Sequence, residues 1–225
     1  MSENRADART PARVLAERIH GADVFAGFSP SLPQDLQGWN SDHPALRRLV
    51  AETRPETVIE VGVWKGASVA FLCGAMRDLG LPGAVVAVDT FLGSPEHWDR
   101  GNPEFFEALR TRHGMPGLYW QFLGNMAHLG LQDRVVPLPQ TSENAAAILG
   151  RLGVRAGLVH IDAAHEYEPV LGDARRFWEL LAPGGALVGD DFPWPGVARA
   201  AREFAAEVGQ ELAVEGPKWI LRKPA

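Results

Sequence analysis

Three acidic residues and a histidine stand where two apolar segments of the sequence end, and together they could prepare a hydroxyl group for reaction. Asp162 ends the segment 156–162, and Asp190 and Asp191 end the segment 185–191. If these segments are neighbouring strands, their ends lie about 5 Å apart. Carboxylates that close raise each other's pKa unless a cation neutralises them, and oxygen ligands favour Mg²⁺, with Mn²⁺ or Ca²⁺ as alternatives. The spacing predicts a divalent metal site at Asp162, Asp190 and Asp191 that would lower the pKa of a substrate hydroxyl.

His165 follows Asp162 by three residues, at the start of the next expected helix. An imidazole at this place could take the proton from the hydroxyl as it reacts, so His165 is the predicted general base. One alternative remains for the acids: Asp191 could cap the following helix, although Pro193 and Pro195 make the start of that helix irregular.

The segment VIEVGVWKGAS, residues 58–68, predicts a buried strand, a glycine turn and a helix. Its pattern is E-x-G-x-x-x-G, with Glu60 ahead of Gly62 and Gly66. A dinucleotide site has the pattern G-x-G-x-x-G, in which close glycines let the backbone approach a pyrophosphate. This turn has bulky residues between its glycines, and Glu60 would repel a phosphate. A ligand with a positive end, such as an ammonium or a sulfonium, suits it better.

Asp89 ends the next expected strand and could accept two hydrogen bonds from ribose hydroxyls. A ribose with a cationic amino-acid tail and no phosphate describes S-adenosylmethionine. The structural alternatives are a satisfied core carboxylate for Glu60, helix–strand packing for Gly62 and Gly66, and a helix cap or turn residue for Asp89.

Short apolar segments alternate along the chain with helical segments of roughly 10–15 residues, which indicates βαβ units and a parallel sheet. Strands are expected at 57–61, 84–89, 134–139, 156–162, 185–191, 211–216 and 218–223, and helices at about 43–53, 66–79, 142–149, 167–181 and 196–209. The last two strands are too close for a crossover helix and should be antiparallel. The sequence predicts an α/β fold with a doubly wound, Rossmann-like, seven-stranded and mostly parallel sheet that ends in an antiparallel hairpin.

Two regions lie outside this pattern. Residues 1–42 are expected to form an N-terminal extension with a short helix at 11–19, which leaves 43–225 as the main domain. Residues 90–125 form an unusually long connection, rich in aromatic residues, between the second and third strands. Its His97 and Trp98 are candidates for a lid over the site, with local packing as the alternative; Trp39 and Trp194 could also reach a substrate.

Composition excludes several classes of protein. The chain has 225 residues, 46% of them apolar, and a net charge of −6, which argues against nucleic-acid binding. No apolar run approaches the ~20 residues of a membrane span, and the charged N-terminus does not resemble a signal peptide. The single cysteine, Cys73, is expected to be a packed core thiol. A chain with one cysteine can form no internal disulfide, which fits a reducing, cytoplasmic compartment. His160 is expected to be a core residue, and Asp173 a solvated helix residue or a partner of Arg176.

Four segments in order resemble the successive motifs of class I S-adenosylmethionine-dependent methyltransferases: VIEVGVWKGAS, VVAVDTFLGS, LVHIDAAHEYEPVLGD and LLAPGGALVGDDF. The resemblance covers about residues 45–222 and is closest to bacterial small-molecule O-methyltransferases of the cephalosporin-hydroxylase-like branch. It implies that the cofactor is bound by Glu60, Gly62, Gly66, Ser68, Asp89, Thr90, Phe91, Thr141, Ser142 and Asp162. Metal-dependent members have two acids after the fifth strand and one after the fourth, with a base three residues further on, which again implies Asp162, Asp190, Asp191 and His165.

The predicted function is methyl transfer from S-adenosylmethionine to a hydroxyl of a small molecule, assisted by Mg²⁺ and a histidine base. A sugar, a polyketide, a phenol or a peptide-derived metabolite would all be compatible acceptors, and a homodimer is permitted. The alternatives are a metal-independent methyltransferase, a non-catalytic S-adenosylmethionine-binding protein and, against the glycine pattern, an NAD-linked oxidoreductase.

Overall fold

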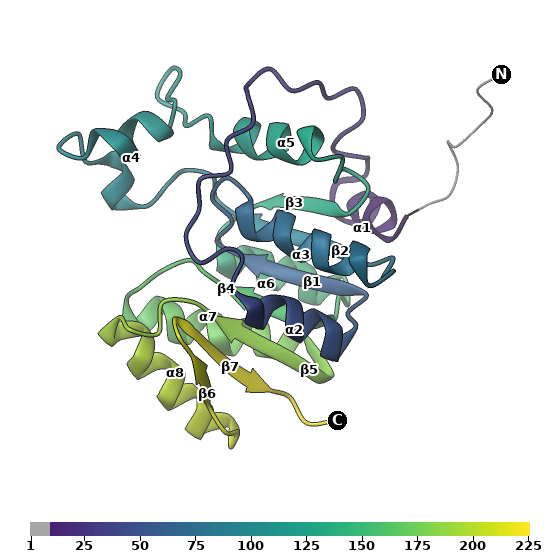
Figure 1. Ribbon diagram of the computed structural model, residues 1–225, viewed down its shortest axis with the longest axis vertical. Helices are drawn as coiled ribbons and strands as arrows, with labels where there is room; N and C mark the ends of the chain where they lie inside the picture. The colour runs from purple at the N-terminus through teal and green to yellow at the C-terminus, as the bar shows by residue number, and fades with distance from the viewer. Residues whose placement is uncertain (1–9) are drawn as a thin grey trace.

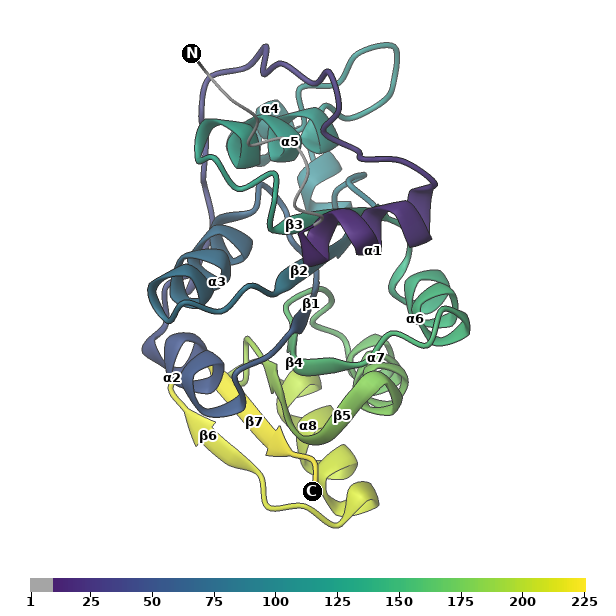
Figure 2. The ribbon, with the colours of Figure 1, turned by 90° about the vertical axis from the view of Figure 1, so that its right-hand side faces the viewer.

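The computed structural model describes residues 10–225 as a seven-stranded sheet with helices on both faces (Figures 1 and 2). The first nine residues of the expected N-terminal extension lie outside the described residues. The strand order is β3-β2-β1-β4-β5-β7-β6. The strands are β1 Thr57–Val61, β2 Ala84–Asp89, β3 Val135–Pro139, β4 Ala156–Ile161, β5 Leu181–Gly189, β6 Ala213–Glu215 and β7 Lys218–Arg222. Strands β1 to β5 pair in parallel, and β7 is antiparallel to both β5 and β6, which confirms the predicted fold class.

Helices cover both faces of the sheet because its central strands are apolar on both sides. On one face lie α2 Pro44–Thr53, α3 Ala67–Asp78 and α5 Leu118–His128, and on the other α1 Pro11–His20, α6 Ser142–Arg151, α7 Tyr167–Leu180 and α8 Pro195–Val208 (Figure 2). The long connection after β2 contains the short helices η1 Pro95–Trp98 and α4 Pro103–Ala108. The expected helices are therefore present, and the connection adds these two short ones.

The described part of the N-terminal extension packs directly on the sheet. Helix α1 buries Ala12, Leu15 and Ala16 in the same hydrophobic core as α6, α7 and α8. The helix packs against β2 and β3 at this edge of the sheet. The boundary at residue 42 stays a prediction, but residues 10–42 complete the core of this domain.

Three smaller expectations can be compared with the structure. Cys73 and His160 are fully buried, as expected of core residues. Asp173 pairs with Arg176 at 3.5 Å but is 4% exposed, so the expectation of a solvated side chain was wrong. In the part of the chain that the structure describes, every helix is too short or too polar to cross a bilayer.

Strands β4 and β5 are neighbours, and this pairing brings the predicted acids together. Ile161 is in register with Gly189, so that Asp162 and Asp190, the next residue of each chain segment, lie at the same edge of the sheet. The backbone N–H of Asp190 donates to the carbonyl of Ile161 at 3.0 Å, which continues the ladder to this edge. The edge holds the carboxyl ends of all five parallel strands, where ligands bind in doubly wound sheets.

Candidate active site

A cavity of about 840 Å³ opens at this edge of the sheet. Its walls come from the ends of β1, β2, β4 and β5, from η1, and from residues 37–41 of the N-terminal extension. The volume lies within the range of small-molecule and cofactor sites, roughly 300–1,000 Å³. The strand order reverses beside β1, so the cavity stands where the fold class predicts a ligand.

The glycine turn forms one wall of the cavity, and both of its glycines are required by geometry. Gly62 has a φ of +83°, and a Cβ there would come within 2.0 Å of the carbonyl oxygen of Asp162. Gly66 has a φ of +89°, and a Cβ there would lie 2.8 Å from the Phe122 ring and from the Met126 methyl group. The turn therefore lets β1 and β4 end side by side, with helix α3 starting directly beneath the cavity.

Replacing Gly62 by alanine is expected to destabilise the protein by more than about 2 kcal/mol, because a left-handed conformation and a backbone clash coincide. Gly74 is a matched control, since it lies within α3 and a Cβ there meets nothing within 4 Å. Gly74→Ala should keep or raise stability by about 0.5–1 kcal/mol. Urea unfolding of both variants measures the difference, and equal midpoints would contradict this account of the turn.

The backbone donors of the turn are already occupied by Asp89. Its Oδ2 accepts from the N–H groups of Val63 and Trp64 at 2.9 and 3.0 Å, and its Oδ1 accepts from the N–H of Phe91 at 2.7 Å. These donors are therefore not aimed at a ligand phosphate, unlike those of a dinucleotide site. A carboxylate offers about four lone-pair sites, so Asp89 can accept one further hydrogen bond, on Oδ1, rather than the two expected from sequence.

Lys65, the residue before Gly66, anchors the N-terminal extension to the turn. Its buried ammonium donates to Asp35 at 2.7 Å and to Gln37 at 2.8 Å. Asn125 reinforces the join by donating to the carbonyls of Asp35 and Lys65 at 2.6 and 2.7 Å. These contacts hold residues 37–41, and with them Trp39, against the mouth of the cavity.

Glu60 and Phe91, two of the expected cofactor residues, lie behind the cavity wall rather than in it. Glu60 is fully buried and accepts a hydrogen bond from the hydroxyl of Ser68, which does line the cavity. Burial raises the pKa of Glu60 to about 8, although the Ser68 hydrogen bond opposes the shift. Phe91 packs its ring against Tyr119 and Phe122 in the core. Direct contact of Glu60 and Phe91 with a cofactor stays a prediction.

Among the other expected cofactor residues, Gly66 does not line the cavity, whereas seven do: Gly62, Ser68, Asp89, Thr90, Thr141, Ser142 and Asp162. Thr90 lines it beside Asp89, and Thr141 and Ser142 line it at the start of α6. Thr141 also caps that helix by accepting from the N–H of Asn144 at 3.2 Å. Asp173 was not expected there, but it lies against Ser142, whose hydrogen bond opposes the rise in the pKa of Asp173 that burial causes.

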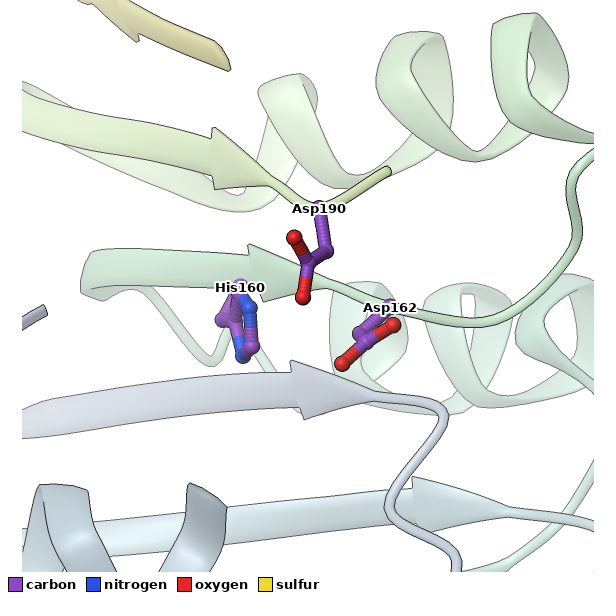
Figure 3. A group of neighbouring side chains, drawn as sticks. All are labelled: His160, Asp162 and Asp190. Carbon is purple, nitrogen blue, oxygen red and sulfur yellow. The ribbon is translucent and has the colours of Figure 1, made fainter. Parts of the chain in front are cut away.

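The predicted metal ligands are only partly brought together. Asp162 and Asp190 face each other, and the third nearby group is His160 rather than Asp191 (Figure 3). One ligand atom from each of these three side chains lies within 4.8 Å of the others. Burial, with a contribution from Asp190, raises the pKa of Asp162 to about 6. The Asp162 carboxylate accepts no hydrogen bond from any side chain or backbone group in residues 10–225, and it lines the cavity.

Lys218 joins this cluster and was missed from the sequence. Its fully buried ammonium donates to Asp190 Oδ2 at 2.8 Å and lies 3.1 Å from His160 Nε2. Burial and the Lys218 charge lower the pKa of His160 to about 4, so the ring is neutral. A signal was present: Lys218 opens a strand antiparallel to β5, so it starts at the edge where the parallel strands end.

Asp191 turns away from the acids and pairs with the predicted base. Its φ of +58° directs the carboxylate so that Oδ2 lies 2.9 Å from His165 Nε2. This hydrogen bond, with the Asp191 charge, raises the pKa of His165 above its usual 6.5. The imidazole stacks on Trp194 with ring centroids 4.9 Å apart. An acid and an aromatic ring therefore fix a half-buried imidazole at the cavity wall.

Aromatic side chains form the outer wall. Trp64 stacks on His97 at 4.3 Å, His97 contacts Phe105 at 5.0 Å, and Phe105 meets Trp39 edge-on at 5.7 Å. All four line the cavity. Trp98, the other lid candidate, donates its indole N–H to the carbonyl of Leu92 at 2.9 Å and is not part of the wall.

Comparison with known proteins gives one family. A family model described as a methyltransferase domain matches residues 59–192, whereas no curated protein matches the chain. The fold is similar to the O-methyltransferase NovP, with a TM-score of 0.64 and 18% identity over 96% of this chain and 93% of that chain. It is also similar to an O-methyltransferase from Bacillus cereus in complex with SAH, with a TM-score of 0.58 and 15% identity over 94% and 91% of the two chains.

A third similar structure is the O-methyltransferase TomG from Streptomyces achromogenes, solved with SAM, with a TM-score of 0.56 and 16% identity over 99% of this chain and 91% of that chain. At these identities the likeness is one of fold. It agrees with the family match, which covers most of β1, strands β2 to β5, the glycine turn and the acids described above.

Proposed function

Because the chain belongs to the methyltransferase domain family, we propose that it transfers a methyl group from S-adenosylmethionine to a hydroxyl of a small molecule. One observation carries the choice of donor: the cavity offers unpaired negative charge where a phosphate site would offer free N–H groups. Asp162 faces it without a hydrogen-bond partner among the described residues, and Asp89 consumes two N–H groups of the turn.

The residues present fit this donor. The turn at Gly62 and Gly66 places the start of α3 beside the cavity, and Asp162 could pair with the ammonium of this donor or face its sulfonium. Asp89 has one acceptor site left for a ribose hydroxyl, and Thr141 and Ser142 would lie near the base. When bound, S-adenosylmethionine would supply an electrophilic methyl group on a positively charged sulfur.

His165 would act as the general base of the reaction. If Nε2 carries the ring hydrogen, it donates to Asp191 and leaves Nδ1 as the proton acceptor. The imidazole would take the hydroxyl proton while the acceptor oxygen bonds to the methyl carbon and the bond from that carbon to sulfur breaks, and Asp191 would stabilise the resulting imidazolium. Trp194 holds the ring plane during this step. The rest of the rate enhancement would come from holding the acceptor oxygen and the methyl donor in line.

A divalent ion at Asp162, Asp190 and Asp191 was part of the prediction, and the residues as they lie do not fit one. Asp190 already binds the ammonium of Lys218, and Asp191 already binds His165. Bringing the three carboxylates to one point would break both pairs. The proposed reaction therefore uses no metal at these acids, and His165 alone removes the hydroxyl proton.

The walls of the cavity describe the acceptor. Seven acidic residues line it, and no Lys or Arg does so within residues 10–225. They are Asp89, Glu96, Asp162, Glu166, Asp173, Asp190 and Asp191. With the aromatic outer wall, this lining favours a flat hydroxylated molecule that is neutral or positively charged. A small-molecule acceptor is supported by two similar proteins, TomG, which is involved in tomaymycin synthesis, and the calicheamicin methyltransferase CalS11.

Two acceptors that differ only in charge should be methylated with clearly different kcat/KM values. We expect the amide of 3,4-dihydroxycinnamic acid to have a kcat/KM at least about tenfold higher than the acid, because a carboxylate would enter a cavity lined by acidic residues and by no Lys or Arg among the described residues. Initial rates at saturating donor measure this ratio. A preference for the anionic acceptor would mean that the acidic lining does not face the acceptor.

The proposal is tested by incubating the protein with S-adenosylmethionine labelled on its methyl group and a panel of hydroxylated phenols, polyketides and sugars. Label should move to an acceptor oxygen, and product hydrolysis or mass spectrometry identifies the methyl ether. Melting temperatures with S-adenosylhomocysteine or NAD⁺ provide the comparison, since only a ligand bound by the folded state raises them. Stabilisation by NAD⁺ alone would replace this proposal with an oxidoreductase.

A further inference from the structure

We propose that the ammonium of Lys218 is the built-in cation of this active site and takes the place at Asp190 where the sequence predicted a divalent ion, so that methyl transfer needs no added metal. The inference rests on the proposed methyltransferase function. Lys218 touches neither reactant in this scheme and is therefore a positioning residue.

The first support is the geometry around Lys218. Nζ lies 2.8 Å from Asp190 Oδ2 and 3.1 Å from His160 Nε2, and all three side chains are buried. An ammonium removed from water is costly unless it is paired and hydrogen-bonded, and here it has both kinds of partner. These are two of the three groups whose arrangement could otherwise hold a metal ion. A divalent ion would have to displace the ammonium or sit beside it.

The second support is the balance of charge. Asp162 and Asp190 bring two carboxylates to the cluster, and Lys218 brings one ammonium. One negative charge is left over when both acids are ionised, which a single positive charge on a ligand would neutralise. If a divalent ion bound these acids while Lys218 kept its charge, the cluster would carry one excess positive charge. That charge would lie in a buried space beside a positively charged sulfur.

The third support is a hydrogen-bonded connection from Lys218 to the base. Lys218 fixes Asp190 through Oδ2, and Asp190 Oδ1 accepts from the backbone N–H of Asp191 at 2.8 Å. That bond helps hold Asp191 in its left-handed conformation, from which the Asp191 carboxylate reaches His165. The position of Lys218 is itself set by the sheet, because Gly189 of β5 is in register with Trp219 of β7.

Lys218 also connects to the far side of the glycine turn. Since Nε2 of His160 accepts from the ammonium, the ring hydrogen is on Nδ1, which faces Glu60 Oε1 at 3.5 Å. Glu60 in turn accepts from the hydroxyl of Ser68 at the start of α3. One buried row of polar groups therefore runs from β7 across β4 and β1 to the helix beneath the cavity. At the β7 end of this row, the ammonium of Lys218 orients the His160 ring through its contact with Nε2.

The test compares the intact wild-type protein with Lys218→Met, which keeps the length of the side chain and removes its charge. Lys223→Met is the matched control, because Lys223 Nζ donates to the carbonyl of Trp178 at 2.8 Å, away from the cavity. Mn²⁺ binding is measured by electron paramagnetic resonance on EDTA-treated protein, and melting temperatures are measured with and without Mn²⁺.

Wild type and Lys223→Met should bind no Mn²⁺ at the cluster, and methyl transfer by both should be unchanged by EDTA. Lys218→Met should gain Mn²⁺ binding and a rise in melting temperature on adding Mn²⁺, which a merely structural lysine would not produce. If Lys218→Met does not fold, the wild-type measurements still decide. Wild-type Mn²⁺ binding abolished by Asp190→Asn, together with activity lost in EDTA, would overturn the inference.

Failure of the proposed function would look different. S-adenosylhomocysteine would then give no binding heat with the wild type, and no acceptor would be methylated with or without metal. Methyl transfer that is present but abolished by EDTA removes only the role of Lys218, and leaves the methyltransferase intact.

Discussion

Replacing His165 by alanine is expected to lower kcat for methyl transfer by about 10²–10⁴-fold, the usual contribution of a general base. The donor site should be little affected, because His165 lies beside Trp194 and Asp191 rather than in the glycine turn. The affinity for S-adenosylhomocysteine should therefore stay within about twofold of wild type, less than about 0.5 kcal/mol. Steady-state kinetics with an acceptor from the panel, together with calorimetry, measure both quantities.

The same residue sets a pH dependence with a definite sign. The base must be neutral to take a proton, and Asp191 raises the pKa of His165 above 6.5 by favouring the charged ring. Activity should consequently fall as the pH drops through this raised pKa. In Asp191→Asn the charged ring loses its partner, so the acidic limb of the kcat profile should move to lower pH while kcat also decreases.

His113→Asn is the control for this prediction. His113 is exposed, lies outside the cavity, and has a φ of 51° that asparagine tolerates well. Its rate and pH profile should match those of the wild type. If His165→Ala retains the wild-type kcat with an unshifted profile, another group removes the proton and the role of His165 is wrong.

Replacing Asp162 by asparagine should weaken binding of S-adenosylmethionine by about 10–100-fold, the equivalent of one charge-assisted hydrogen bond of about 1.5–3 kcal/mol. The reason is that Asp162 is a partly buried carboxylate that lines the cavity and accepts no hydrogen bond from the described residues. S-adenosylhomocysteine lacks the sulfonium charge. If the Asp162 carboxylate lies near the sulfur, Asp162→Asn should weaken binding of S-adenosylhomocysteine less than binding of S-adenosylmethionine. If the carboxylate pairs only with the ammonium, the affinities of both ligands should fall equally.

Asp78→Asn provides the matched control for Asp162→Asn. Asp78 is exposed at the far end of α3 and pairs with Arg47 at 2.8 Å. This variant removes the same charge from the protein without approaching the cavity. Calorimetric titration should give wild-type affinities for it. An unchanged affinity of Asp162→Asn for both ligands would show that Asp162 does not bind the donor.

The pattern of the sequence was sufficient for the fold and for much of the cavity. Strands such as 84–89 are continuous apolar runs, which buried parallel strands require, and polar residues at their ends pointed to one edge of the sheet. Thr90, Thr141 and Ser142 reach the cavity for this reason. The family resemblance to a methyltransferase was also confirmed.

The parts that sequence could not give depend on contacts between distant segments. Spacing placed Asp191 with the other acids, but a left-handed backbone at that residue directs it to His165. Lys218 follows Asp190 by 28 residues, and only the register of β7 on β5 brings the two together. Side-chain direction also explains why Glu60 does not line the cavity as the sequence predicted. A side chain of β1 points either towards the ligand or into the packing on the sheet, and that of Glu60 points into the packing.

The most direct test of the account is a calorimetric titration of the EDTA-treated protein with S-adenosylhomocysteine, repeated with NAD⁺. The account predicts saturable binding of S-adenosylhomocysteine without any added metal, and no binding of NAD⁺. An absence of heat with S-adenosylhomocysteine, or saturable binding of NAD⁺ in its place, would contradict it.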